Sequence, residues 1–166
     1  PIAESEAVAV FDALGRVLDD EVISPISVPP HDNSAMDGFA FDGAQLVPGQ
    51  PLTLQLAEGT AFAGKAWIGS LVSDQCVKIM TGAIMPAGLD TVVPLEFVRV
   101  EEGRLTVPAD VVRRGDNRRL LGEDLMAGHP ALARGQTLGP AALGLIASLG
   151  LPTVRRVAEE HGGAVQ

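Results

Sequence analysis

Three polar turns in the sequence carry the side chains best suited to chemistry. The first spans residues 29–40 and contains Asp37 directly beside Gly38. Two prolines at its start fix an extended entry, and the backbone turn that follows can project the Asp37 carboxylate into a cleft. The alternative is that the acidic and amide side chains here only cap and turn the chain.

The second polar turn is Met80-Thr81-Gly82-Ala83, which follows an apolar stretch. A strand that ends in such a turn offers a hydroxyl and backbone N–H groups, both of which suit an oxyanion. An ordinary strand-ending turn would have the same composition. Further on, Asp90 and Glu96 flank the apolar residues 91–95, and each is either a surface charge or a site carboxylate.

The third polar turn, residues 113–124, holds four of the twelve basic side chains of the chain within seven positions. Guanidinium groups bind phosphate through two parallel hydrogen bonds, so this cluster suits an anion. Alternatively, the arginines neutralise nearby carboxylates on a solvated loop. The adjacent Glu123-Asp124 pair offers hard oxygen ligands of the kind that Mg²⁺ prefers.

Other common catalytic arrangements are missing from the sequence. His31, His129 and His161 are scattered, lack the spacing of a zinc site and are expected at the surface. The single cysteine, Cys76, cannot form an internal disulfide and is expected to be a small core residue rather than a reactive thiol. Serine-hydrolase, P-loop and dinucleotide-binding motifs are also missing.

The charge and hydropathy patterns exclude two classes of partner. The net charge of −9 arises in residues 1–100, with 4 basic against 13 acidic side chains, which argues against a nucleic-acid partner. The longest apolar stretch, residues 138–151, is shorter than the ~20 residues of a membrane span and contains three glycines. We therefore expect no membrane segment.

The elements that position these turns are mostly short. The 19 glycines and 12 prolines are spread along the chain, as in a mostly-β fold. Period-two alternation predicts a strand over 52–56, the β pattern continues at 77–79 and 92–95, and a hairpin is predicted over 97–107. Helical spacing predicts two helices, over 11–18 and 139–150.

The two predicted helices bracket the β-rich middle of the chain. This order predicts a discontinuous first domain into which a second domain is inserted. Residues 158–166 have little apolar content, so we expect them to fray and to be the start of a segment that has been cut away.

Taken in order, five sequence blocks resemble the MoeA family of molybdenum cofactor biosynthesis, which includes gephyrin. The resemblance extends to Gly150 and is carried by these residues: Ala13 to Leu18; Pro30 to Ala40; Ile79 to Ala83 with Pro86, Gly88, Asp90 and Val92 to Glu96; Asn117, Arg119, Gly122 to Asp124 and Gly128; and Gly144 to Gly150.

The resemblance implies an α+β, mostly β fold like the N-terminal region of that family. An elongated first domain, residues 1–28 and 125–166, would hold an inserted β-rich second domain, residues 29–124. The third and fourth domains of the family have no counterpart in the sequence. The chain is therefore expected to be an amino-terminal fragment that is inactive alone.

The resemblance also implies an activity, that of a molybdopterin molybdenumtransferase. Such an enzyme inserts molybdate into adenylylated molybdopterin and releases AMP with the help of Mg²⁺. We accordingly expect a cytoplasmic homodimer whose partners are these two substrates, with no nucleic acid and no membrane.

Site residues follow from the resemblance position by position. Asp37, Thr81 and Asp124 are the expected catalytic residues, with Asp37 and Asp124 holding Mg²⁺ or molybdate or positioning a water. The other matched positions are expected to bind substrate or anions: Ser34, Gly82, Ala83, Arg119 and Glu123.

Two other functions remain open at this point. One is a non-catalytic dimerisation and scaffolding module of a gephyrin-like protein, and the other is an anion- or molybdate-binding module without turnover. The presence of Asp37, Thr81 and Asp124 favours the enzyme, because a site that has lost its activity need not keep its carboxylates.

Overall fold

The computed structural model describes residues 5–157. The chain divides into two compact units: unit 1 consists of Pro1–Val28 and Asp124–Gln166, and unit 2 of Pro29–Glu123. The second boundary lies one residue before the predicted one, so that Asp124 belongs to unit 1. Residues 158–166, which were expected to fray, lie outside the described residues.

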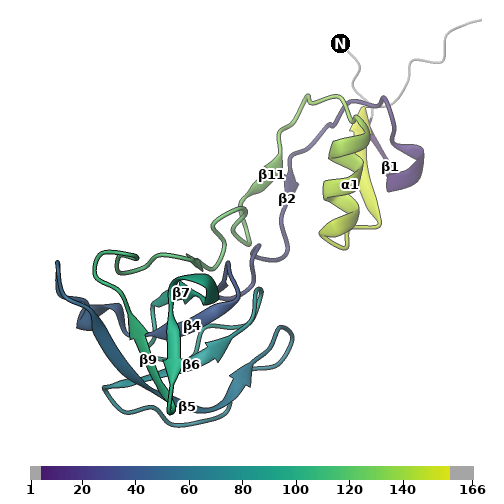
Figure 1. Ribbon diagram of the computed structural model, residues 1–166. Helices are drawn as coiled ribbons and strands as arrows, with labels where there is room; N and C mark the ends of the chain where they lie inside the picture. Colours follow the sequence, from purple (N-terminus) through teal and green to yellow (C-terminus); the bar gives the residue numbers. More distant parts are fainter. Residues whose placement is uncertain (1–4, 158–166) are drawn as a thin grey trace, which may run out of the picture. The chain divides into compact units, whose positions relative to one another are not determined.

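Unit 1 is built from two short strand pairs and one helix (Figure 1). Its elements are β1 (Ser5–Ala9), the 3-10 turn η1 (Val10–Asp12), β2 (Val22–Ile23), β11 (Pro130–Leu132), α1 (Pro140–Ser148) and β12 (Thr153–Val157). Strand β1 pairs with β12, and β2 pairs with β11, both antiparallel.

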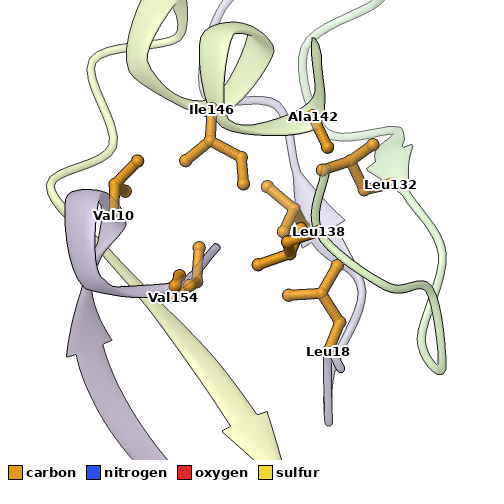
Figure 2. Packing of buried hydrophobic residues seen from close by; sticks show 9 residues of the cluster. Val10, Leu18, Leu132, Leu138, Ala142, Ile146 and Val154 are labelled. Atoms are coloured by element: carbon orange, nitrogen blue, oxygen red, sulfur yellow. The ribbon is translucent and has the colours of Figure 1, made fainter. Parts of the chain in front are cut away.

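The core of unit 1 gathers under helix α1. Ile146 points from the helix toward Val10, Leu138 and Val154, and all four side chains are buried (Figure 2). The predicted helix over 139–150 is confirmed, because α1 has Pro at its first position and Gly150 follows its end with φ +73°. No helix within residues 5–157 is long and apolar enough to cross a membrane.

The helix predicted over 11–18 is wrong. Only η1 forms there, ending at Asp12, and Gly15 has φ +75°, a left-handed conformation that does not occur within an α-helix. The Gly15 N–H donates to the Leu138 carbonyl, and Leu18 donates to Gln136. Backbone hydrogen bonds to residues 136–138 therefore take the place of the hydrogen bonds that a helix would form. Phe11, the first residue of the predicted helix, is 88% exposed.

Unit 2 contains a six-stranded sheet in the order β7-β4-β6-β5-β9-β8 (Figure 1). Its elements are β3 (Asn33–Ser34), β4 (Gly38–Phe41), η2 (Gly43–Gln45), β5 (Leu52–Ala61), β6 (Gln75–Ile79), β7 (Thr91–Pro94), η3 (Leu95–Phe97), β8 (Arg99–Glu101), β9 (Arg104–Val107) and β10 (Arg118–Arg119). Strands β5 and β6 run parallel, the other neighbours are antiparallel, and β3 pairs separately with β10.

The predicted strands and hairpin of unit 2 are confirmed, as is a mostly β fold. Successive residues of a strand point to opposite faces, and both faces of the central strands are buried. In β4, Phe39 and Phe41 belong to one apolar cluster and Ala40 to the other. In β6, Cys76 belongs to the same cluster as the two phenylalanines, and Val77 belongs to the cluster of Ala40.

Cys76 is expected to resist alkylation in the folded chain. Its side chain is fully buried, and this burial raises the thiol pKa to about 12, so the reactive thiolate is scarce at neutral pH. Iodoacetamide labelling followed by mass spectrometry should modify Cys76 only after denaturation. Rapid labelling of the native chain at pH 8 would contradict this prediction.

Candidate functional site

The centre of the candidate site is a direct contact between Asp37 and Thr81. Asp37 Oδ1 accepts a hydrogen bond from the Thr81 hydroxyl at 2.6 Å and another from the Thr81 N–H at 2.7 Å. Asp37 directly precedes β4 and Thr81 closely follows β6. Because these antiparallel strands pair Gly38 with Ile79, the two polar turns meet at one end of the sheet.

Gly38 allows the backbone beside Asp37 to approach β7. A Cβ at position 38 would overlap the carbonyl oxygen of Val93, which directly precedes Pro94, the β7 residue paired with Gly38. The Leu95 N–H also donates to the Asp37 carbonyl at 3.1 Å. The backbone that carries the carboxylate is therefore fixed from β7, while the Asp37 side chain itself stays exposed.

The contact with Thr81 also sets the charge of the carboxylate. The Thr81 hydroxyl stabilises the ionised form and lowers the pKa of Asp37, and the Thr81 N–H lowers it further. Slight burial opposes both effects, and the positive charge of Lys78 adds a smaller lowering. Asp37 is therefore a solvent-facing, ionised carboxylate at neutral pH.

The N–H groups of the second polar turn, which were expected to suit an oxyanion, already donate to acceptors within the chain. The Thr81 N–H is used by Asp37, the Gly82 N–H donates to the Ser34 carbonyl at 2.8 Å, and the Ala83 N–H donates to the carbonyl of Met80 at 3.0 Å. These three donors are therefore already engaged within unit 2.

Ser34 has a positioning role in the structure. Its side chain is buried, and its hydroxyl donates to the Met36 carbonyl at 2.6 Å. Its N–H donates to the Ala83 carbonyl at 3.0 Å. Ser34, Gly82 and Ala83 thus hold the Asp37–Thr81 contact in place, and binding of an anion by them stays a prediction.

Arg119 and Glu123 contact each other. Arg119 Nε lies 2.6 Å from Glu123 Oε1, and the other carboxylate oxygen accepts the Leu120 N–H at 2.8 Å. Strand β10 places Arg119 opposite Asn33, in the turn that leads to Asp37. Arg119 therefore lies on the strand that pairs with the Asp37 turn, and Glu123 contacts Arg119 from the loop that follows this strand.

Two other arginines of the third turn also pair with carboxylates. Arg114 lies 2.6 Å from Asp90, and Arg118 lies 3.7 Å from Asp32. These contacts favour the interpretation that the arginines neutralise nearby carboxylates. Contact with an anion by Arg119 stays a prediction.

Asp90 is a structural carboxylate. It accepts hydrogen bonds from Gly43 N–H at 2.8 Å, Thr91 hydroxyl at 2.8 Å and Arg114 Nε at 2.6 Å. Burial raises its pKa, but these donors together outweigh the burial and leave the pKa of Asp90 below its ordinary value. Asp90 thereby ties η2, β7 and the arginine turn together.

Asp124 belongs to unit 1, where its N–H donates to the Val28 carbonyl at 3.0 Å and its side chain is exposed. A metal centre made by the chain alone is not found: no three metal-binding side chains come together among residues 5–157. Mg²⁺ is often held by one or two carboxylates together with substrate phosphates and water. The exposed, ionised Asp37 fits that kind of site.

One residue near the site, Lys78, was missed by the sequence analysis. Its charge acts on Asp37, and it lies in β6, where Cys76, Val77 and Ile79 are all fully buried. A lysine between the apolar residues Val77 and Ile79 of a predicted strand was the signal that could have identified it.

Replacing Thr81 with valine is expected to raise the pKa of Asp37, because the variant loses the hydroxyl that contributes most to the lowering. A carboxylate with a lowered folded pKa stabilises the fold above its ordinary pKa of about 3.9, and this contribution is lost as the pH falls through the folded value. The free energy of unfolding of Thr81→Val should therefore fall less on acidification than that of the wild type.

The measurement is an NMR pH titration of the Asp37 carboxyl carbon. Thr81→Ser, which keeps the hydroxyl, is the matched control and should retain the low pKa. An unchanged pKa in Thr81→Val would show that the hydroxyl contact does not form in solution.

The chain matches the family model described as the MoeA N-terminal region (domain I and II) over residues 1–150. Among curated proteins, it is 38% identical over 152 residues to the molybdopterin molybdenumtransferase of Haemophilus influenzae, covering 92% of this chain and 37% of the relative. It is 38% identical over 151 residues to the protein of that name from Synechococcus elongatus, covering 88% of this chain and 37% of the relative. It thus spans little more than a third of the length of these relatives.

Solved structures give the same relationship. The crystal structure of the molybdopterin biosynthesis MoeA protein from Pyrococcus horikoshii OT3 superposes with a TM-score of 0.84 at 28% identity. The match covers 93% of this chain and 41% of that one. The chain therefore shares its fold with that structure, and the family model that matches residues 1–150 shows that the chain belongs to the MoeA N-terminal-region family.

Proposed function

We propose that the chain is part of a molybdopterin molybdenumtransferase, which inserts molybdate into adenylylated molybdopterin and releases AMP. The observation that carries this proposal is the exposed, ionised Asp37 held by Thr81, in a chain whose relatives bear that enzyme name. In the same proposal the enzyme is a cytoplasmic homodimer that uses Mg²⁺.

The chemistry suits a carboxylate that stays ionised. Molybdate is a dianion, and the second substrate carries phosphates, so negative groups crowd the site and a cation must offset them. Asp37 would hold Mg²⁺, which supplies that positive charge when bound. The same carboxylate can also orient a water by accepting a hydrogen bond from it.

The chain spans 37% of the length of its curated relatives, so the proposed activity concerns the longer protein that contains it. Asp124 is proposed as a further catalytic residue of that longer protein. Arg119 and Glu123 are proposed to act near substrate, because Arg119 lies on the strand that pairs with the Asp37 turn and Glu123 contacts Arg119.

The test is release of AMP from adenylylated molybdopterin in the presence of molybdate and Mg²⁺. It compares the 166-residue chain with the longer protein that contains it. Release by the longer protein alone would support both the activity and the inactivity of the isolated chain. Release by neither would show that the proposed activity is wrong.

A further inference from the structure

A cavity in unit 2 lies beside η2, the 3-10 turn that follows β4. It has a volume of about 620 Å³, within the range of pockets that hold small molecules. Two loops line it, one within residues 43–50 and the other within residues 110–114. Asp37 precedes β4 and η2 follows it, so the cavity and the Asp37–Thr81 contact lie at opposite ends of that strand.

The two loops that line the cavity are tied to each other. The Gly49 N–H of the first loop donates to Asp110 Oδ1 of the second at 3.0 Å. The Gly43 N–H donates to one oxygen of Asp90 at 2.8 Å, and the other oxygen accepts from Arg114 Nε at 2.6 Å. A Cβ at position 43 would lie only 2.8 Å from Arg114 Cγ, so glycine allows this close approach. The walls are therefore positioned before any ligand arrives, which lowers the entropic cost of binding.

The floor of the cavity is apolar. Four of its lining residues have aliphatic side chains: Leu46, Val47, Pro48 and Val112. Val112 is buried in the cluster that contains Phe41, and Leu46 packs against the same cluster. Val47 is 52% exposed, so part of this apolar surface faces solvent. Such a floor suits an aliphatic or aromatic group of a ligand.

One cation and one carboxylate oxygen in the lining have no partner of their own. Arg113 is the one arginine of the third polar turn whose guanidinium forms neither a hydrogen bond nor an ion pair within residues 5–157. Asp110 uses Oδ1 to accept the Gly49 N–H, and its Oδ2 accepts no hydrogen bond from that part of the chain. Arg114 differs, because Asp90 neutralises it. A free positive and a free negative group thus line the same apolar cavity.

We propose that this cavity binds a free α-amino acid with an apolar side chain. The ligand carboxylate pairs with Arg113, the ammonium group with Asp110, and the side chain packs on Leu46 and Val112. A guanidinium binds a carboxylate through two parallel hydrogen bonds, and an ammonium group donates to a carboxylate oxygen. The two charges of the ligand match the two free charges of the cavity. The inference goes beyond the proposed enzyme activity and does not depend on it.

A set of leucine analogues tests each contact separately. Isocaproate has the carbon chain of leucine without the amino group, isoamylamine lacks the carboxylate, and glycine lacks the side chain. Each compound is titrated into the 166-residue chain up to millimolar concentrations, and the amide signals are followed by NMR. We expect L-leucine to shift the signals of Gly43 and Gly49 saturably. Each analogue should bind about tenfold more weakly or worse, because it loses a charged hydrogen bond or the apolar contact.

Two substitutions test the assigned residues. Arg113→Gln should weaken leucine binding about tenfold, as expected for loss of a charged hydrogen bond, and should remove the preference for leucine over isoamylamine. Arg99→Gln, which removes an exposed cation from β8 of the same unit, is the matched control and should bind leucine normally.

Asp110→Asn removes only the charge. Asparagine tolerates the φ of +59° at this position and keeps an oxygen that can accept the Gly49 N–H, so the loop should stay folded. The variant should bind leucine no better than isocaproate, because the ammonium group then has no carboxylate to pair with.

Three results would overturn the proposal: no saturable shift with L-leucine, binding of isocaproate or isoamylamine as tight as that of leucine, or equal weakening by Arg113→Gln and Arg99→Gln. Tight binding of isocaproate would identify a site for carboxylates in general. Tight binding of isoamylamine would assign the cavity to amines and exclude Arg113 from it.

Discussion

Replacing Asp37 with asparagine in the longer protein is expected to lower the rate of AMP release about a hundredfold or more. The variant loses the negative charge that would hold Mg²⁺ or orient a water, and such groups typically contribute rate factors of this size. Asparagine keeps a side-chain oxygen that can accept the two hydrogen bonds from Thr81, so the local structure should remain.

The measurement is single-turnover AMP release under saturating substrate, compared with far-UV circular dichroism to verify folding. Asp74→Asn is the matched control, because Asp74 is exposed in the same unit and precedes β6 at the other end of that strand. A wild-type rate in Asp37→Asn would remove Asp37 from the site. Loss of the rate in both variants would point to a general effect of charge.

Replacing Phe41 with alanine is expected to destabilise unit 2 by about 3–5 kcal/mol, the usual cost of deleting a buried phenylalanine ring. Phe41 is fully buried in β4, between β6 and β7, and packs in the cluster with Leu54 and Val93. The substitution leaves a cavity in the middle of the sheet that positions Asp37 at its end.

Urea unfolding followed by Trp67 fluorescence measures this change in unit 2, which holds the only tryptophan. Phe97→Ala is the control, because Phe97 is 48% exposed and its truncation should cost about 1 kcal/mol or less. A loss below about 1 kcal/mol for Phe41→Ala would mean that the sheet repacks around the missing ring.

Local patterns determined most of the strands. The alternation over 52–56 and the glycine turn at 102–103 have local physical causes, and both β5 and the β8–β9 hairpin form where the sequence predicts them. The helix predicted over 11–18 does not form, because backbone N–H groups in this segment donate to carbonyl groups at positions 136 and 138 instead. These acceptors lie more than a hundred residues further along the chain. Helical spacing alone contains no information about such a competing partner.

The candidate site also combines features that the sequence predicts with features that depend on distant contacts. The sequence placed Asp37 and Thr81 in separate turns, and the resemblance assigned them to one site. The structure joins the two residues through two hydrogen bonds. The sequence did not show that the N–H groups of Gly82 and Ala83 already donate to carbonyl groups of the chain. Which donors a turn leaves available depends on what packs against it.

By itself, then, the sequence determined the mostly β character of the chain, the positions of its polar turns and its family. Only the tertiary structure decided which turns meet, since the antiparallel pairing of β4 with β6 places Asp37 beside Thr81. It also decided that Arg114 is paired with Asp90 and that Trp67 is packed on two glycines beside a cavity. The physical reason is that propensity and hydropathy act over a few neighbouring residues, whereas strand register and close packing join residues far apart in the chain.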